Sequence, residues 1–125
     1  MLFREIKINI VVLFLGFIFT SSVYSQDQIE WKRINLLSDR GIILNEIEVI
    51  KKNIRDLEER LTNDLEKLQL NYEQWVRRNG MDDTSRALLN DINDRKERGE
   101  LDIKQQKRRL ENLYEELKII DNKLN

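Results

Sequence analysis

The sequence contains no cysteine, no histidine and no proline, and only four of its 125 residues are glycine. Without histidine or cysteine the chain cannot build a Ser-His-Asp triad, a thiol nucleophile, a Cys/His zinc site or a disulfide framework. The scarcity of glycine and proline predicts few turns, and therefore a small number of long elements. These absences argue against an enzyme and favour one elongated domain.

The sequence also has no excess of either charge, because it contains 22 Lys and Arg residues and 23 Asp and Glu residues. A nucleic-acid binder would show a basic excess, so we expect no nucleic-acid partner. The carboxylates are scattered along open helix faces and form no loop of metal ligands. We therefore predict no catalytic residue, no cofactor and no metal site, and expect the partners to be proteins.

The first 25 residues have the composition of a signal peptide. Arg4 and Lys7 precede an apolar run, residues 10–19, and small or polar residues follow it. Val23 and Ser25 occupy the −3 and −1 places of a small-x-small cleavage site, which predicts removal of residues 1–25 and export to a bacterial periplasm.

A retained membrane anchor over residues 8–24 is the alternative interpretation. A helix that crosses the hydrocarbon needs about 20 apolar residues, and the run is shorter than that. If the segment were retained, the protein would be anchored in the inner membrane with its helices facing the periplasm.

From residue 41 onward the apolar residues recur at alternating intervals of three and four, which predicts an all-α fold: a long antiparallel two-helix coiled-coil hairpin. The first seam is Ile43, Ile47, Ile50, Ile54, Leu57, Leu61, Leu65, Leu68, Tyr72 and Trp75. The second is Leu89, Ile92, Lys96, Gly99, Ile103, Gln106, Leu110, Leu113, Leu117, Ile120 and Leu124. Asn79 and Gly80 suit a helix end, so the tip is expected near residues 79–84.

Position numbers of antiparallel partners should have a constant sum, and the two seams match at sums of 163 and 164. This register places Leu61 opposite Ile103, and Leu65 opposite Gly99. Glycine and lysine in the seam predict a weakly packed middle. We expect Lys96 to extend its charge to solvent and Gln106 to fix the register there. The alternative is that the middle bends. On the outer faces we expect acid-first i,i+4 ion pairs. They are Glu48–Lys52, Asp56–Arg60, Asp91–Arg95, Asp94–Arg98 and Glu100–Lys104.

Residues 26–40 precede the hairpin and carry apolar side chains with no partner in the two seams. Ser38 to Gly41 resembles a break, with Ser38 or Asp39 as the N-cap of the long helix. Because an isolated hairpin buries little apolar surface, we expect a homo-oligomer held by this base segment. The alternative is that the segment folds back on the same chain. Its candidate residues are Ile29, Trp31, Ile34, Leu36 and Leu37.

The tip combines aromatic, apolar and arginine residues, a composition typical of an interaction hot spot. The other interpretation is that Trp75 closes the seam over Leu89 while the arginines balance the helix end. The candidate partner-binding residues are Trp75, Arg77, Arg78, Met81, Arg86 and Leu88.

The stretches RINLLSDRGIILNEIEVIKKNIRDLEERL and NGMDDTSRALLNDINDRKE resemble the Skp/OmpH family of periplasmic chaperones between Ile34 and about Lys118. The resemblance implies a trimer joined at its base, whose prongs hold unfolded outer-membrane proteins without ATP. That family adds strands to the base after the hairpin and is often strongly basic, and this sequence shows neither feature up to Asn125.

The rival interpretation belongs to another class, a structural adaptor or strut in an envelope complex such as a motor, divisome or secretion apparatus. An adaptor would bind one fixed partner and lose it on single tip or base substitutions, whereas a holdase would tolerate them.

Overall fold

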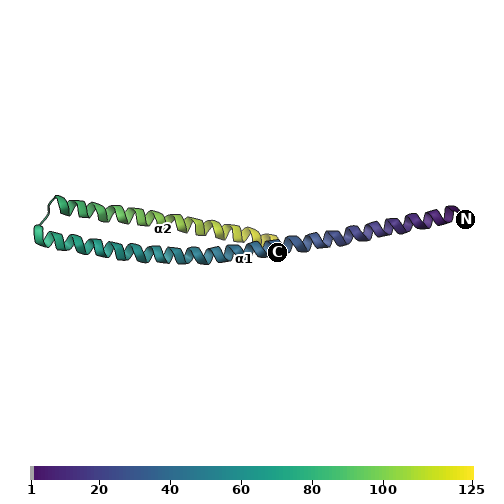
Figure 1. Ribbon diagram of the computed structural model, residues 1–125, viewed down its shortest axis with the longest axis horizontal. Helices are drawn as coiled ribbons and strands as arrows, with labels where there is room; N and C mark the ends of the chain where they lie inside the picture. The colour runs from purple at the N-terminus through teal and green to yellow at the C-terminus, as the bar shows by residue number, and fades with distance from the viewer. Residues whose placement is uncertain (1) are drawn as a thin grey trace. The chain divides into compact units, whose positions relative to one another are not determined.

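The computed structural model describes the backbone of residues 2–125 and the side chains of residues 26–125. Within this range helix α1 spans Leu2–Asn79, helix α2 spans Asp83–Leu124, and there is no strand (Figure 1). The predicted all-α helical hairpin is confirmed. The predicted signal peptide falls on residues 1–25, whose side chains lie outside the described range, and it stays a prediction. Among the helical residues with described side chains, no stretch is long and apolar enough to cross a membrane.

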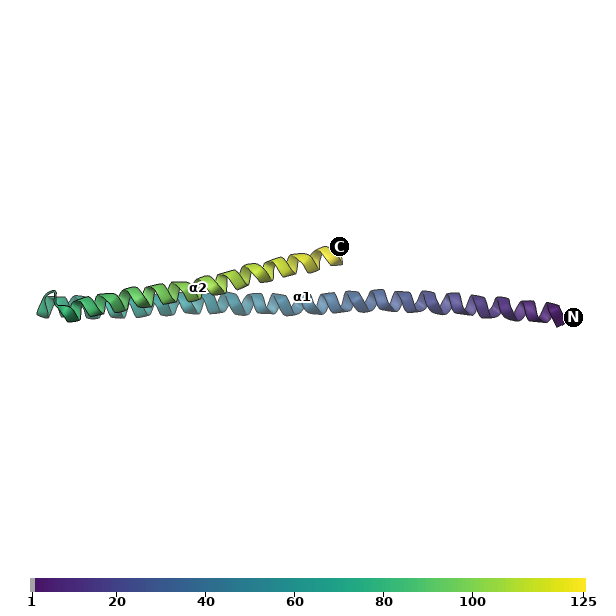
Figure 2. The same ribbon diagram turned by 90° about the horizontal axis from the view of Figure 1, so that it is seen from above.

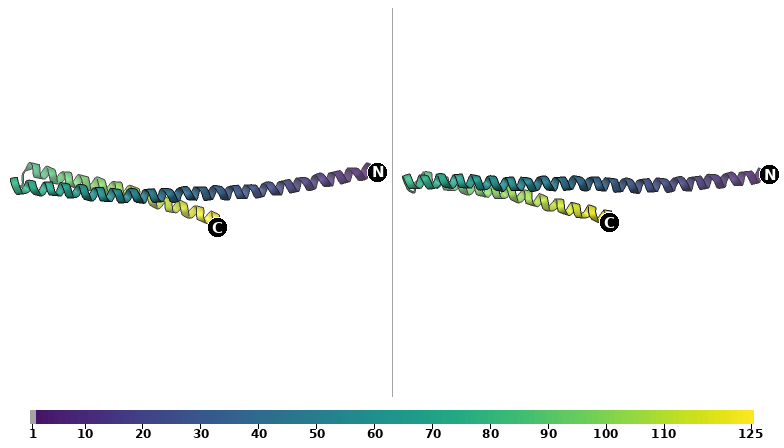
Figure 3. Two further views of the ribbon diagram at one scale, coloured as in Figure 1. Left: turned by 60° about the horizontal axis from the view of Figure 1, so that its bottom comes forward. Right: turned by 90° about the horizontal axis from the view of Figure 1, so that it is seen from below.

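The chain divides into two units, one of residues 42–119 and one of residues up to 41 together with residues 120–125. In the first unit α2 lies beside α1 and runs in the opposite direction (Figure 1). The views in Figure 2 and Figure 3 show that the two helices cross over this range. The core of this unit is therefore the strip where the two helices meet.

The seam predicted for α1 is confirmed, because every one of its positions is buried or half-buried. Ile47 is 2% exposed, and the helix passes through residues of high helix propensity with no proline to interrupt it. The buried apolar side chains of the first unit are Ile43, Ile47, Ile50, Ile54, Leu61 and Leu113. This pattern is that of one helix presenting a single apolar stripe to its partner.

The seam predicted for α2 is wrong near the tip. Leu88 is half-buried and Leu89 is 38% exposed, while Arg95 is half-buried and Lys96 is exposed. The reason is Ser85, which is fully buried and sets the phase of the first turns of α2. Two successive intervals of four residues around position 99 then restore the predicted phase from Ile103 onward, where the seam positions are again buried or half-buried.

The predicted register and the weakly packed middle are also wrong at Gly99. This glycine is buried, and a Cβ atom built at position 99 would overlap the δ carbons of Leu61, one of them at 2.9 Å. Gly99 therefore faces Leu61, not Leu65, and the helices touch closely at this level. The glycine allows a close approach and leaves no gap.

The predicted break at Ser38 to Gly41 is absent, because α1 is helical throughout these residues. Gly41 does not have a positive φ, and nothing lies within 4 Å of a Cβ built there, so its backbone follows the helix without strain. Ser38 and Asp39 are exposed within a continuous helix. Carbonyl groups of the preceding turn accept the hydrogen bonds of the backbone N–H groups there, so these residues have no N-cap role.

The predicted i,i+4 ion pairs are not formed among the described residues. Most of the ion pairs that do form link positions far apart in the chain, and they are Arg40–Asp121, Arg95–Asp64, Lys107–Glu58 and Arg109–Glu46. The two local pairs, Lys51–Glu48 and Arg86–Asp83, are of the i,i+3 type. Charged side chains at the edges of the seam therefore pair mainly with residues of the facing helix, and less often with residues of their own helix.

Candidate interaction surfaces

The tip begins where α1 ends at Asn79. Gly80 has a φ of 73°, and its N–H donates to the carbonyl of Val76 at 2.8 Å. A glycine in the left-handed region terminates a helix at low cost because it has no Cβ. Arg77 and Arg78 in the last turn are exposed, and their charge favours the carbonyl end of the helix dipole.

A reciprocal capping box starts α2. The backbone N–H of Ser85 donates to Oδ1 of Asp82 at 2.8 Å, and the backbone N–H of Asp82 donates to Oγ of Ser85 at 2.8 Å. These two bonds satisfy donors that the first turn of a helix leaves free. The spacing Asp-x-x-Ser at 82–85 carries this signal in the sequence, so the inward position of Ser85 could have been predicted from it.

Trp75 joins the same cluster from α1, because its indole Nε1–H donates to Oδ1 of Asp82 at 2.9 Å. The backbone hydrogen bond from Ser85, followed by the hydrogen bond from Trp75, holds the pKa of the Asp82 carboxyl below its ordinary value. Trp75 is half-buried and its one polar group has a partner. The indole therefore fixes the turn, and only part of its ring is open to a partner.

The other predicted tip residues differ in how much surface they offer. Met81 is 61% exposed, with its sulfur 3.5 Å from the hydroxyl of Tyr72. Arg86 is exposed, and its Nη1 lies 3.4 Å from Oδ1 of Asp83. Leu88 is half-buried in the seam. The turn thus places Met81 and the arginine side chains on the outside of a hydrogen-bonded frame.

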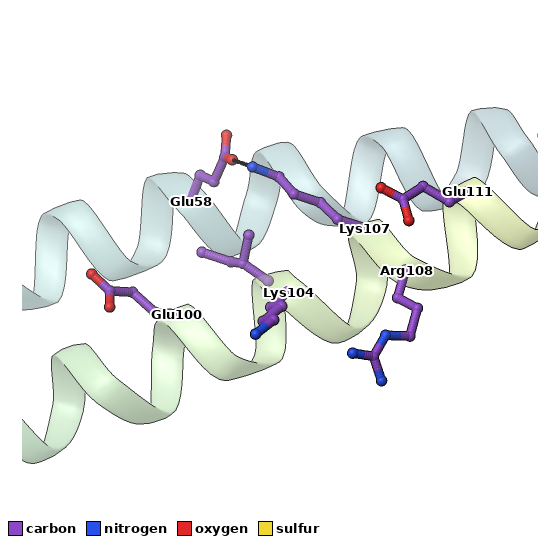
Figure 4. Close-up of a pocket in the computed structure, with 7 residues that line it drawn as sticks. Glu58, Glu100, Lys104, Lys107, Arg108 and Glu111 are labelled. Carbon is purple, nitrogen blue, oxygen red and sulfur yellow. Dashed lines mark ion pairs between the residues drawn. The ribbon is translucent and has the colours of Figure 1, made fainter.

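Several shallow grooves follow the line between the helices, and two of them are similar in volume. One, of about 590 Å³, has a mixed charged lining in which Lys107 reaches Glu58 at 3.3 Å (Figure 4). Arg108 extends away from α1 in this view, and the lining carries three basic and three acidic side chains. It is lined by Glu58, Glu100, Ile103, Lys104, Lys107, Arg108 and Glu111. The equal numbers of the two signs leave the groove without a net charge that would select an anion.

The other groove, of about 580 Å³, lies nearer the tip and has a more apolar floor. It is lined by Leu65, Glu66, Gln69, Leu70, Glu73, Ile92 and Lys96. Leu70 is 55% exposed at its edge. We call this surface the tip-side groove.

In the unit formed by residues up to 41 and residues 120–125, the predicted base residues are mostly open to solvent. Ile29 and Trp31 are 66% and 65% exposed, Ile34 and Leu37 are 56% and 50% exposed, and Leu36 is half-buried. Arg40 Nε donates to Oδ1 of Asp121 at 2.7 Å, and α2 ends three residues after that aspartate, at Leu124. This ion pair links α1 to α2 at the level of Arg40.

Within residues 26–125 no group of three or more acidic side chains converges as a metal site would. Comparison with protein families, with curated proteins and with solved structures finds no match to this chain. The resemblance to the Skp/OmpH family therefore rests on the sequence stretches alone.

Proposed function

We propose that this protein is an exported, non-enzymatic helical hairpin that holds unfolded envelope proteins in the periplasm, in the manner of the Skp/OmpH chaperones. The observation that supports this is the distribution of its exposed apolar side chains. Ile42, Val49, Leu70, Leu101 and Ile119 are each exposed by half or more, and they are spread over both helices among charged residues. Many separated apolar contacts suit a client that binds weakly at many points.

The exposed side chains at Ile29, Trp31, Ile34 and Leu37 support a second part of the proposal, that copies of the chain associate through residues 26–40. Burying an apolar side chain is worth about 1.5–3 kcal/mol, so association of these residues would add stability that a single hairpin lacks. An oligomer of this kind would surround a client with several hairpins.

The experiment uses the protein recovered after expression of the full chain in a bacterial host. The first readout is N-terminal sequencing, which should give Gln26 as the first residue. The second is light scattering of an unfolded outer-membrane protein diluted out of urea, with and without this protein. We expect aggregation to be suppressed without ATP. Unchanged scattering at a several-fold molar excess would contradict the holdase.

A structural adaptor is the second candidate, and the hydrogen-bonded tip favours it. Trp75, Asp82 and Ser85 hold the turn in one arrangement and leave Met81 exposed beside arginine side chains. A fixed patch of this kind suits one partner of fixed shape. Replacing Met81 with Ser separates the candidates, because an adaptor would lose its partner while a holdase would keep most of its activity.

A further inference from the structure

One side of helix α1 carries no charge over residues 31–45. When the heptad positions are lettered a to g with Trp31 at a, every residue of this stretch at a, d, e or g is uncharged and exposed. The charged residues of the stretch all fall at b and c, and they are Lys32, Arg33, Asp39 and Arg40. The apolar residues at the uncharged positions are Trp31, Ile34, Leu37, Ile42 and Leu44. We call this surface the uncharged face.

The uncharged face lies on the side of α1 that does not contact α2. The residues of this stretch that are buried or half-buried are Leu36, Arg40 and Ile43, and they fall at f and c. Arg40 marks this side, because its Nε donates to Asp121 of α2 at 2.7 Å. Positions c and f lie across a helix from a and d. The hairpin therefore leaves the uncharged face open to solvent.

We infer that two copies of the chain pack together through the uncharged face, with their α1 helices parallel and in register. The inference rests on the proposed association through residues 26–40, and it names the face, the direction and the register of that association. In such a pair each a or d residue meets the same residue of the other copy, so a charge there would meet its own charge. The uncharged positions avoid this repulsion over 15 residues, about 22 Å of helix.

Asn45 favours the parallel direction. In a parallel, in-register pair the two Asn45 side chains meet, and an amide both donates and accepts, so the two amides satisfy each other. An antiparallel pair centred on Ser38, the middle of the face, would place Trp31 over Asn45 and leave the amide without a partner. A covering client segment or lipid chain without a matching polar group would leave the same amide unpaired.

Small residues in the middle of the uncharged face allow the two backbones to approach each other. Ser38 and Gly41 occupy successive a and d positions, and nothing lies within 4 Å of a Cβ atom built at Gly41. The larger side chains of Trp31 and Ile34 lie at one end of the face and can pack against their copies. Of the exposed apolar residues assigned above to clients, the face includes only Ile42, so the two kinds of contact use different surfaces.

The test exploits the absence of cysteine, since a single introduced cysteine can form a disulfide only between two copies. The variant Ser38→Cys places the thiol at position a of the face, and Asp39→Cys places a thiol at the neighbouring position b, which is also exposed. With the full chain as recovered from cells and a mild oxidant, we expect Ser38→Cys to form the disulfide-linked dimer about tenfold faster. Equal rates for the two variants would overturn the inference.

A second cysteine position tests the direction of packing. In a parallel, in-register pair Asn45→Cys should cross-link at a rate comparable to that of Ser38→Cys. In an antiparallel pair identical residues meet at one level only. The two positions are seven residues apart, about 10.5 Å along the helix, whereas a disulfide joins Cα atoms about 4.4–6.8 Å apart. Fast cross-linking at only one of the two positions would therefore overturn the parallel register.

An introduced charge tests the polar pair at position 45. In the Ser38→Cys background, Asn45→Asp should slow the cross-linking several-fold at neutral pH, because the two carboxylates would face each other. Asn53→Asp is the matched control, since Asn53 is exposed at position b, off the face, and this change should leave the rate unaltered. An equal response to the two substitutions would overturn the pairing, and circular dichroism checks that each variant stays helical.

Two isoleucine variants separate this inference from the proposed association through residues 26–40. Ile34 lies at position d of the face and Ile29 at position f, and they are 56% and 66% exposed. Light scattering over a range of concentrations should give a dissociation constant about tenfold higher for Ile34→Ser and unchanged for Ile29→Ser. Equal weakening by both would leave the proposed association standing and overturn the uncharged face. A monomer at every concentration would overturn both.

Discussion

The indole N–H of Trp75 donates to the same Asp82 oxygen that accepts the backbone N–H of Ser85, at 2.9 and 2.8 Å. One carboxylate oxygen therefore links the last turns of α1 to the first turn of α2. The turn between the helices is held from both sides, and this arrangement has consequences that can be measured.

Acid should weaken the tip. The pKa of Asp82 is lowered in the folded chain, so its hydrogen bonds contribute stability in full above the ordinary pKa of the carboxyl. That contribution is lost as the pH falls below about 4 and approaches the lowered value, because the unfolded chain takes up the proton first. Thermal unfolding followed by circular dichroism between pH 2 and pH 6 would measure the loss.

The control for this prediction is Asp82→Asn, which keeps the size of the side chain and removes its titration. The difference in melting temperature between the protein and this variant should shrink as the pH is lowered. A difference that stays constant over the whole range would contradict the assigned role of the carboxylate.

Replacing Ser85 with Ala should destabilise the hairpin by about 1 kcal/mol, the usual contribution of a hydrogen bond at a buried site. The hydroxyl is fully buried and accepts the N–H of Asp82, which the variant would leave without its partner. Thr84→Ala is the matched control, since Thr84 is exposed one residue away. Urea unfolding of the two variants gives the comparison, and equal loss in both would argue against the capping box.

Two glycine substitutions should have opposite effects. Gly99→Ala should destabilise the chain by about 1–3 kcal/mol, because the new methyl group would overlap the δ carbons of Leu61 and force that side chain to move. Gly41→Ala should stabilise it by up to about 1 kcal/mol, because the site is open and helical and alanine has the higher helix propensity.

The clash at Gly99 can be checked by shortening its partner. In a Leu61→Ala background the Gly99→Ala change should cost less than in the natural chain, and the difference measures the coupling of the two positions. Chemical denaturation of the four proteins supplies the cycle. Additive effects would mean that Leu61 and Gly99 do not meet.

The ion pair between Arg95 and Asp64 should contribute little. Its shorter N–O distance is 2.7 Å, but the two side chains are 36% and 43% exposed, so solvent screens the interaction. We expect a coupling of about 0.5 kcal/mol in a double-mutant cycle, falling as salt is added. A coupling that does not respond to salt would indicate packing of the arginine stem and not charge.

Trp31 should report on whatever covers residues 26–40. The chain has two tryptophans, so Trp75→Phe leaves Trp31 as the only one. Because Trp31 is 65% exposed in the single chain, its emission should lie at long wavelength in dilute solution and move to shorter wavelength as copies associate. An emission maximum independent of protein concentration would count against association through this segment.

The helices and the seam of α1 could be predicted from apolar spacing alone, because a stripe repeated over ten positions leaves one consistent face. The phase of α2 could not be predicted in this way, because Leu88 and Leu89 both fit a heptad pattern. A hydrogen bond at the start of the helix determines which of the two leucines lies in the seam. The hydrogen bond from the backbone N–H of Ser85 to Asp82 places the serine in the seam. Leu88 and Arg95 then occupy later positions of the same seam.

The apolar spacing places Gly99 in the seam, and the structure confirms this position, but the weak packing that a glycine predicts there is wrong. Glycine in a helix lowers its stability in isolation, which suggested a point of bending, but the facing Leu61 fills the space that the glycine leaves. Propensity describes one helix by itself, whereas this contact depends on two. The same limit applies at Ser38 to Gly41, where local turn signals did not interrupt a helix that has no proline.

The Leu61–Gly99 contact also restricts how one helix can move past the other. A lengthwise shift of α2 by one turn, about 5.4 Å, would put Arg95 or Ile103 opposite Leu61, and each is far larger than glycine. No second glycine exists in α2 to receive the leucine in a shifted register. The Leu61–Gly99 contact therefore opposes lengthwise sliding of the two helices within residues 42–119. Binding at the tip would not be transmitted along the hairpin by a one-turn shift of α2.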